Sequence, residues 1–586
     1  MLLAQHRCSV ASRPLTTVCC TAATPAVGSR SKITTSYSSN HSRSSVLTPT
    51  SPLTTTTQKR SYLTGGDEHV DVLCIGGGVM SASVGLLCKL LEPSWNVKII
   101  ERLESPAMES SEAYNNAGTG HAAYCELNYT SESQLETGEH HVEIAKALDI
   151  CEKFHVSKQW WAYLTKERIL DIPVTNWLNH TPHLSFVHGD ANVAMLKRRY
   201  ERLKKEPLFS SMEFTEDEKT IAEWAPLIMD GRQSGAEKLA CTRVQMGTDN
   251  DWGALTGGLI AAFERAGGTF VGNWEADKLR QNSDGTWTVH QKSTYTQSGL
   301  PDLTATGLPD PFGFGSKAEV NTRANFVFVG AGGASLQLLQ KAKIPEIAGY
   351  GGFPVSGQFF VCRKPEVVCR HSVKCYGKAA VGSPPMSVPH LDRRYIRGEE
   401  LLLFGPYAGF SPNFLKHGSP LDLISTVNPF NVIPMVAAGG QNIDLSVYLA
   451  KELASTKAER MQVLREFFPN AQDEDWSQIT AGQRVQIMKE DKAKVGIIQF
   501  GTEIIQKADR TISGLMGASP GASVSVQIAL DVVEKAWPDF VQGKWKNKLE
   551  QMIPGYKKQL NENKDLYKEV ALKDKAGSHS VLGIPH

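Results

Sequence analysis

The chain has 586 residues, 41% hydrophobic and 21% charged, with 62 Lys and Arg against 61 Asp and Glu. This length predicts two or more lobes with large buried cores. The balanced charge argues against a nucleic-acid-binding protein, which usually carries a basic excess. No run approaches the roughly 18 uninterrupted apolar residues of a spanning helix, which excludes an integral membrane protein but not attachment to a membrane surface.

Residues 1–66 differ in composition from the rest of the chain. They contain no Asp or Glu, five Arg, two Lys and 25 Ser or Thr. A basic, hydroxyl-rich segment without acidic residues is typical of an organelle transit peptide. Arg60-Ser61-Tyr62 also resembles the sequence after which mitochondrial processing often cuts. We therefore expect residues 1–62 to be a mitochondrial transit peptide, with a plastid leader and a merely disordered tail as the alternatives. Without its seven positive charges the chain carries a net charge of −6.

The eight cysteines after this leader are scattered, and none forms a Cys-x-x-Cys pair. This pattern fits a reduced compartment rather than a disulfide framework. No set of four Cys and His residues has the spacing of a zinc site, so no metal site is expected.

A βαβ unit opens the part of the chain that carries chemistry. Residues 70–75 read as a buried strand, residues 79–91 as a helix ended by Pro93, and residues 96–100 as a second strand. The turn before the helix is glycine-rich, so the backbone can approach a pyrophosphate that the free N–H groups of the helix would bind. An acid that ends the second strand can accept hydrogen bonds from a ribose. We predict a dinucleotide site formed by Gly76, Gly77, Gly78, Met80, Ser81 and Glu101; the alternative is a glycine-rich turn in an unrelated α/β domain.

The layout after this unit favours FAD over NAD. Long helical stretches follow at 132–154, 159–166 and 191–205, instead of the regular βαβ succession of an NAD domain. Later strands are predicted at 287–289 and 326–329, and the second of these leads into Gly330-Ala331-Gly332-Gly333. A second glycine-rich turn about 250 residues downstream is typical of flavoproteins whose FAD domain is assembled from separate segments.

We therefore predict a mixed α/β fold in which a discontinuous Rossmann-like FAD-binding domain is interleaved with a substrate domain of mixed sheet and helices. The Pro- and Gly-rich residues 299–316 are expected to be a surface insertion. The predicted FAD-binding segments are 67–130, 240–280, 318–345 and 481–540, and the predicted substrate-domain segments are 131–239 and 346–480.

Several motifs in consistent order resemble those of the malate:quinone oxidoreductase family. Over residues 68–560 they are the Gly76 turn, Asn115-Asn116-Ala117-Gly118-Thr119-Gly120-His121, Gly247-Thr248-Asp249, Pro384 to Asp392, Ala481 to Ile487, and Gly517 to Ser523. The resemblance implies a D-amino-acid-oxidase-like fold, FAD as cofactor, and oxidation of (S)-malate to oxaloacetate. It also implies that the electrons pass to a membrane quinone at the membrane surface.

Three residues in these motifs are candidates for catalysis. Arg484 is the first choice to bind a substrate carboxylate, because its guanidinium forms two parallel hydrogen bonds; a surface Arg at a strand end is the alternative. His121 and His390 are candidates for the base that takes the hydroxyl proton, and either could instead bind the second carboxylate. A purely structural histidine is the alternative for each.

Further cofactor contacts follow from the same resemblance. The glycine-rich loop before His121 is placed near the flavin ring, and residues 517–521 precede a helix at 522–537 whose N-terminus would stabilise negative charge on reduced flavin. A tight turn before a core helix is the alternative. The residues predicted here are Asn116, Gly118, Thr119, Gly330, Gly332, Gly517, Ser519, Gly521 and Ala522.

Residues 541–586 form a basic segment in which lysines alternate with Trp545, Tyr556 and Tyr567. We expect a helical tail there that docks on anionic lipid at the mitochondrial inner membrane; solvated helix faces are the alternative. For the whole protein, three further functions stay open. They are another FAD-dependent 2-hydroxyacid dehydrogenase such as an L-2-hydroxyglutarate dehydrogenase, a non-catalytic dinucleotide-binding scaffold, and an NAD-linked dehydrogenase.

Overall fold

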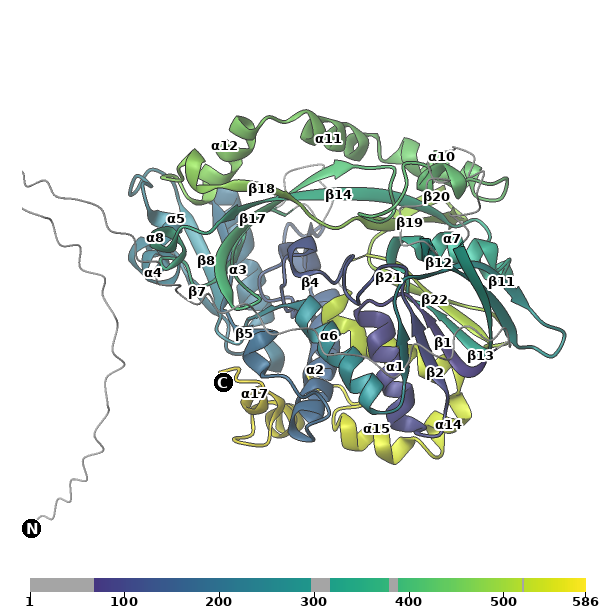
Figure 1. Ribbon diagram of the computed structural model, residues 1–586. Coiled ribbons are helices and arrows are strands. Elements are labelled where there is room, and N and C mark those ends of the chain that lie inside the picture. Colours follow the sequence, from purple (N-terminus) through teal and green to yellow (C-terminus); the bar gives the residue numbers. More distant parts are fainter. Residues whose placement is uncertain (1–67, 297–316, 379–387, 519–520, 586) are drawn as a thin grey trace, which may run out of the picture. The chain divides into compact units, whose positions relative to one another are not determined.

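The computed structural model describes residues 68–296, 317–378, 388–518 and 521–585. The predicted leader and the predicted insertion at 299–316 lie outside these residues. Two large sheets organise the described chain (Figure 1), and the cavity described below lies where segments from both come together. The prediction of a mixed α/β fold is confirmed.

The first sheet has eight strands in the described chain. The strands β10, β2, β1, β13 and β22 run parallel, and β12, β11 and β21 pair antiparallel at its sides. Their bounds are β1 Glu68–Ile75, β2 Val97–Ile100, β10 Thr269–Val271, β11 Trp274–Gln281, β12 Trp287–Thr296, β13 Lys317–Val329, β21 Thr502–Gln506 and β22 Ile512–Gly517. Because parallel strands end at one edge, the turns after β1, β2, β13 and β22 meet there.

Helices cover both faces of this sheet, which explains why the ends of β1 and β13 are apolar and why three of the four residues of β2 are. On one face α1 (Val79–Leu91) packs between α6 (Trp252–Arg265) and α13 (Ser525–Ala536), with α2 (Ala145–Lys166) beyond α13. On the other face lies α7 (Ser335–Lys341).

The second sheet has ten strands and is antiparallel except where β15 pairs with β6. Its bounds are β6 His183–His188, β7 Glu213–Thr215, β8 Leu239–Val244, β14 Gly351–Cys362, β15 Lys374–Tyr376, β16 His390–Ile396, β17 Glu399–Phe410, β18 Ser477–Thr480, β19 Arg484–Asp491 and β20 Val495–Gln499. A short separate pair, β5 (Leu178–His180) with β9 (Thr248–Asn250), lies next to it.

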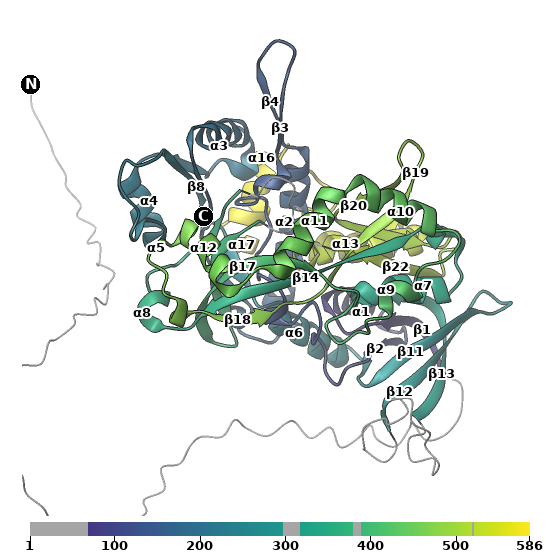
Figure 2. The ribbon, with the colours of Figure 1, turned by 90° about the horizontal axis from the view of Figure 1, so that it is seen from above.

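Helices cover this sheet as well. Those around its core and its edges are α3 Asp190–Leu203, α4 Glu218–Trp224, α5 Pro226–Met229, α8 Pro365–Val368 and α12 Lys457–Phe467. Along the outer side run α9 (Asp422–Ser425), α10 (Val432–Gln441) and α11 (Ile443–Ala454), which Figure 2 shows in front of β14 and β20.

One of the predicted helices is wrong at its start. Residues 131–143 form a hairpin of β3 (Ser131–Gln134) and β4 (His140–Glu143), because Gly138, with φ +84°, allows a tight turn. The break expected between 154 and 159 is absent, since no Gly or Pro interrupts that stretch, and α2 is continuous from Ala145 to Lys166. The helices at 79–91 and 191–205 are present as α1 and α3.

The sheets divide the chain differently from the predicted segments. All of the strand β8 except Leu239 lies within 240–280, and the strands β19 and β20 lie within 481–540, yet all three belong to the second sheet. The helix α2, predicted with the substrate domain, packs into the same apolar core as α1 and α13. The cause is that the chain crosses between the two sheets several times, and motif spacing alone does not show these crossings.

The C-terminal segment is helical, but its aromatic residues point inward. Its helices α14 Pro538–Gln542, α15 Lys546–Met552, α16 Lys564–Tyr567 and α17 Ser578–Val581 pack on α2 and α13. Trp545, Tyr556 and Tyr567 are buried in that core, so the expectation that they contact lipid is wrong. Throughout the described residues, no helix has both the length and the apolar character that crossing a bilayer requires.

Candidate active site

A cavity of about 540 Å³ opens at the edge where the parallel strands of the first sheet end. Four stretches supply most of its wall: the turn after β1, the loop from 107 to 121, the residues after β13, and the residues around the end of β22. The strand β19 of the second sheet adds Arg484. Ligands of open α/β sheets bind at this edge, since the helix N-termini point at it.

The turn after β1 has the shape that a closely approaching phosphate requires. Gly76 has φ +105°, and a Cβ there would lie 2.5 Å from the carbonyl oxygen of Gly330. The helix α1 begins at Val79 without a side-chain cap from Gly78, and Val79 N–H donates to Ser111 Oγ at 3.1 Å. The residues Gly76 to Met80 line the cavity, so the positive end of the helix dipole faces it.

Glu101 lines the cavity and holds this turn in place. One carboxylate oxygen accepts a hydrogen bond from Gly77 N–H at 2.5 Å, and the other accepts one from Leu103 N–H at 2.8 Å. Burial raises the pKa of Glu101, while these two backbone donors act to lower it. Each oxygen keeps a second lone pair that a ribose hydroxyl can use.

The second glycine-rich turn and the segment after β22 form further parts of the cavity wall, beside the start of α1. Gly330, Gly332, Gly517, Gly521 and Ala522 all line the cavity. A short helical turn over Ala522–Val524 leads into α13, so the first free N–H groups of this helix lie next to the cavity. Ser519 is outside the described residues. Ser81 is buried against Gly330 and is not among the residues that line the cavity.

The loop before His121 also lines the cavity and is held by its own side chains. Asn116 Oδ1 accepts from Gly118 N–H at 2.9 Å, and its amide nitrogen donates to the Glu112 carbonyl at 2.8 Å. Gly118 has φ +63°, and a side chain there would overlap the guanidinium of Arg394. Thr119 Oγ1 lies 2.7 Å from Tyr376 Oη.

His121 lies on the cavity wall between two tyrosine rings, Tyr129 and Tyr376. Desolvation lowers its pKa to about 3, and the nearby His183, His390, Lys374 and Arg484 act in the same direction. The imidazole is therefore neutral at physiological pH and can accept a proton. Its backbone N–H donates to Ser523 Oγ at 2.9 Å, which ties the loop to the segment before α13.

Arg484 is the first residue of β19 and points into the same cavity. Desolvation lowers its pKa, and the hydroxyls of Tyr376 and Tyr129 act in the opposite direction. An Arg stays charged at any physiological pH, so the cavity offers a cation beside the neutral His121. The structure thus brings two of the three predicted catalytic residues together.

His390 takes a different position, because it is not among the residues that line the cavity. Its ring stacks on Tyr376 with 4.3 Å between centroids and 9° between planes. Its Nδ1 lies 2.9 Å from Asp392 Oδ2. Desolvation would raise the pKa of Asp392, yet His390 and Lys374 lower it to about 2, so this carboxyl is ionised.

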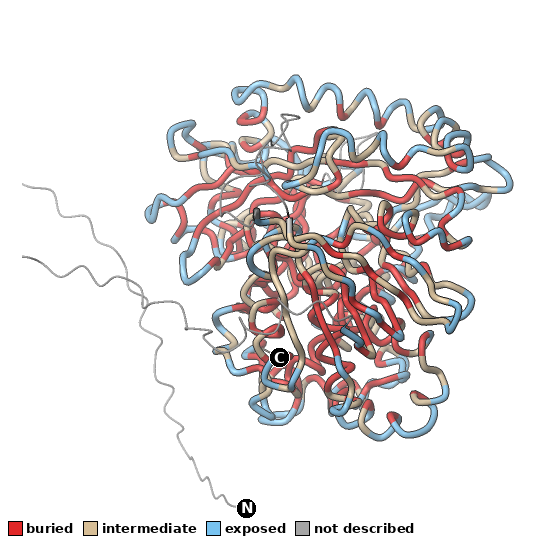
Figure 3. Tube along the Cα trace, turned by 45° about the vertical axis from the view of Figure 1, so that its right-hand side comes forward, coloured by how far each residue is buried: buried red, intermediate tan, exposed pale blue. Residues whose placement is uncertain are grey.

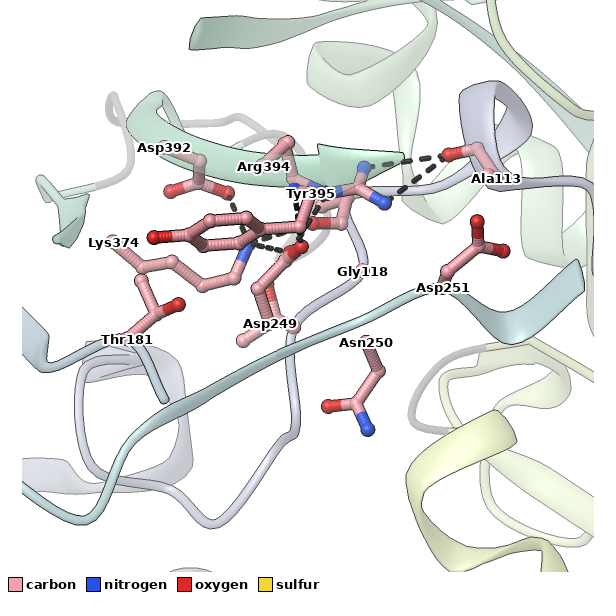
Figure 4. Close-up of polar contacts among 12 residues, drawn as sticks. Ala113, Gly118, Thr181, Asp249, Asn250, Asp251, Lys374, Asp392, Arg394 and Tyr395 are labelled. Atoms are coloured by element: carbon pink, nitrogen blue, oxygen red, sulfur yellow. Dashed lines mark hydrogen bonds and ion pairs between the residues drawn. The ribbon is translucent and has the colours of Figure 1, made fainter. Parts of the chain in front are cut away.

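A buried cluster of four charges supports this end of the cavity (Figure 4). Asp249 Oδ1 lies 2.8 Å from Lys374 Nζ and 2.7 Å from Arg394 Nε, and Lys374 Nζ is also 3.3 Å from Asp392 Oδ2. All four side chains are fully buried, and their two positive and two negative charges balance.

The two cations of this cluster also hold the cavity loop. Lys374 Nζ donates to the Ala117 carbonyl at 2.8 Å, and Arg394 donates to the Asn116 carbonyl at 2.7 Å. Sequence reasoning assigned no role to any of the four residues. Asp249 and Asp392 lie within quoted motifs, but the short apolar strand around Lys374 gives no signal of its own.

Comparison with solved structures finds oxidases at low similarity. An L-alpha-glycerophosphate oxidase from Mycoplasma pneumoniae, with FAD bound, has a TM-score of 0.48 and 13% identity, covering 80% of this chain and 95% of that one. A glycine oxidase from Geobacillus kaustophilus has a TM-score of 0.48 and 14% identity over the same shares.

Comparison of sequences finds much closer relatives. Two proteins named "Probable malate:quinone oxidoreductase", from Geobacillus kaustophilus and Flavobacterium psychrophilum, are each 46% identical to this chain. The matches cover 88% and 86% of this chain and 97% of each relative. The sequence profile of the malate:quinone oxidoreductase family matches residues 68–305 and 313–578, and the chain therefore belongs to that family.

Proposed function

We propose that this protein oxidises (S)-malate to oxaloacetate with FAD as cofactor and passes the electrons to a membrane quinone. One observation carries the proposal: a neutral imidazole, His121, and a cation, Arg484, line the same cavity as the glycine turn that opens α1. Malate oxidation needs these three elements together, namely a base, a binding site for carboxylate and a dinucleotide site.

The residues of the cavity fit FAD. The turn from Gly76 to Met80 would hold the pyrophosphate, and Glu101 would accept from the ribose. Gly330 and Gly332 leave room on one side, and Gly521 and Ala522, before α13, would face the flavin ring. When bound, FAD accepts the two electrons and the C2 hydrogen of malate.

Arg484 would bind one carboxylate of malate through two parallel hydrogen bonds and so fix the orientation of C2. This assignment is supported by its place on the cavity wall, at the strand end nearest the loop that carries His121.

His121 would take the proton of the C2 hydroxyl. In the ligand-free cavity its pKa is low because desolvation and the nearby cations disfavour the protonated ring. A bound dianion would offset those cations and so raise the basicity of His121 when substrate is present. His390 would act at one remove, because its contact with Tyr376 fixes the hydroxyl that bonds to Thr119 on the cavity wall.

Location is part of the proposal. The family match begins at residue 68, directly after the acid-free leader, whose composition supports a mitochondrial transit peptide over residues 1–62. We propose a peripheral position on the inner mitochondrial membrane, because a lipid-soluble quinone has to reach a protein without a spanning helix in its described residues.

The proposed function is tested by adding malate to the purified protein without oxygen and following the flavin absorbance at about 450 nm. We expect the band to bleach with malate and not with L-2-hydroxyglutarate, and to return when a quinone analogue is added. Bleaching only by L-2-hydroxyglutarate would support the other hydroxyacid dehydrogenase instead. A colourless protein, or malate-dependent reduction of NAD, would contradict the proposal.

A further inference from the structure

Exposed apolar side chains gather on one face of the second sheet. Sixteen large apolar side chains are exposed in the described chain, and ten of them lie between Leu421 and Leu453. The most exposed of these, Phe430, Val436 and Ile424, show 75%, 70% and 69% of their surface. We call residues 421–453 the α9–α11 face. In Figure 3 the helices along the upper edge are largely pale blue, the colour of exposed residues.

The helix α10 presents apolar residues on both of its sides. Pro434 and Ala438 are buried, and α10 packs on β19 and β20. Ile433, Val436 and Gly440 point outward at the i, i+3, i+7 spacing of one helix face. The helix contains no charged residue. A surface helix normally turns its polar side outward, so this face is built to meet something other than water.

The helix α11 continues the same pattern. Its buried residues Leu445 and Leu449 face the strand β17, while Ile443, Val447 and Ala450 are exposed at the i, i+4, i+7 spacing. Figure 2 shows α10 and α11 near the hairpin of β19 and β20, with α9 apart from them, next to α7. The result is an extended apolar band rather than isolated exposed residues.

Lysines flank this band. Lys492 and Lys494 are exposed at the tip of the β19–β20 hairpin, and neither makes an ion pair with another described residue. The tip is joined to the end of α10, because the Gln441 amide donates to the carbonyls of Lys494 at 2.6 Å and Gly496 at 3.2 Å. Val495, between them, is also exposed. Apolar side chains next to unpaired lysines match the acyl and phosphate layers of an anionic lipid surface.

The band begins where the cavity wall ends. Leu415, Gly418 and Asp422 line the cavity, and Asp422 is the first residue of α9. A lipid surface on the α9–α11 face would therefore lie next to the cavity. If the proposed function holds, a lipid-soluble quinone would approach the cofactor from this lipid surface.

We propose that the α9–α11 face, together with Lys492 and Lys494, is the surface by which this protein docks on an anionic phospholipid bilayer. The inference rests on the proposed function only in one respect, namely that a quinone in the membrane accepts the electrons. Docking itself follows from the apolar band and its lysines. It assigns to α9–α11 the role that the C-terminal aromatic residues cannot take, because those residues are buried.

The test is co-flotation of the full chain with vesicles, either of phosphatidylcholine alone or of phosphatidylcholine and phosphatidylglycerol in equal amounts. We expect the chain to float with the mixed vesicles. The triple variant Ile433→Ser, Val436→Ser, Val447→Ser should lower vesicle affinity by at least about tenfold. The variant Lys492→Glu, Lys494→Glu should lower the preference for anionic vesicles by about tenfold.

The matched control is the double variant Leu135→Ser, Tyr295→Ser, which removes exposed apolar side chains elsewhere and should float like the unchanged chain. Malate oxidation with a water-soluble dye should be the same in all variants, whereas oxidation with a quinone dissolved in the vesicles should fall in the triple variant. Dye activity separates this inference from the proposed function, because a chain inactive with dye can still float.

Three results would overturn docking on lipid by this face. The first is that the unchanged chain fails to float with the mixed vesicles. The second is that the triple variant floats as well as the unchanged chain. The third is a dimer in solution, measured by light scattering, that the triple variant dissociates, since the face would then be covered by a second copy.

Discussion

The two ends of the cavity are built by opposite means. At the end near α1, glycines bring backbone N–H groups close to the cavity, with the carboxylate of Glu101 beside them. At the end near Arg484, side chains line the cavity instead, and the loop that carries His121 is held by buried charges from distant strands. The first arrangement suits a ligand that is recognised by its phosphates and is always present. The second suits a small substrate that must be oriented by individual charged groups.

The largest expected effect is at the substrate end. Changing Arg484→Ala should lower kcat/KM for malate by about a thousandfold, because the bidentate contact to a carboxylate is lost. The flavin absorbance should stay, since the residues that would bind the pyrophosphate and the ribose, Gly76 to Met80 and Glu101, lie at the other end. Arg397→Ala, which removes an exposed Arg that pairs with Glu112, serves as the control and should leave kcat/KM unchanged. Loss of flavin in Arg484→Ala would mean that the two ends are not separate.

The next largest effect is expected in the buried charge cluster of Asp249, Lys374, Asp392 and Arg394. Changing Asp249→Asn should lower the free energy of unfolding by about 3 kcal/mol, because Lys374 and Arg394 would then share one buried carboxylate. Thermal or urea unfolding measures this. The control is Asp251→Asn, two residues away, which alters a cap on α6 and should cost only about 1 kcal/mol. Equal losses in the two variants would show that the cluster adds no special stability.

At the cofactor end the change is Gly76→Ala. A Cβ there would meet the Gly330 carbonyl, and Ala is strained at φ +105°, so we expect FAD affinity to fall by about 30-fold. Titration of the apoprotein with FAD measures the affinity. Gly257→Ala, in α6 with open space around it, should bind FAD normally. An unchanged affinity in Gly76→Ala would contradict a phosphate cradle at this turn.

The smallest effect concerns pH. The pKa of His121 is lowered to about 3, so the free protein holds this imidazole neutral above that value, and kcat/KM should change less than about twofold between pH 6 and pH 8. If His121 had an ordinary pKa of about 6.5, kcat/KM would instead be about fourfold lower at pH 6 than at pH 8. That fall would remove His121 as the base.

The same shift has a consequence for stability. The unfolded chain protonates His121 below about pH 6.5, whereas the folded chain does so only near about pH 3. The unfolded state therefore binds more protons in this window, so the contribution of His121 to stability is complete above the unfolded pKa and is lost as the pH falls.

The difference between the two ends of the cavity also explains which parts of the fold and the site were predictable from sequence. The cofactor end depends on contiguous patterns, a strand, a glycine turn and a helix, and α1 was predicted at its observed bounds. The charge cluster depends on pairs such as Asp249 with Lys374, which are far apart along the chain, so no local pattern links them. The buried tail aromatics were missed for the same reason, since distant packing partners bury them. The β3–β4 hairpin was missed for a local reason, because the turn at Gly138 interrupts a stretch that was expected to be helical.

The hydrogen bond from His121 N–H to Ser523 Oγ spans 402 positions of the chain. A ribosome must therefore have released almost the entire polypeptide before the pocket can close. Until then, nascent or partly degraded forms lack one side of the flavin cradle. Such fragments would neither retain the chromophore nor turn over substrate, so colour would report complete synthesis.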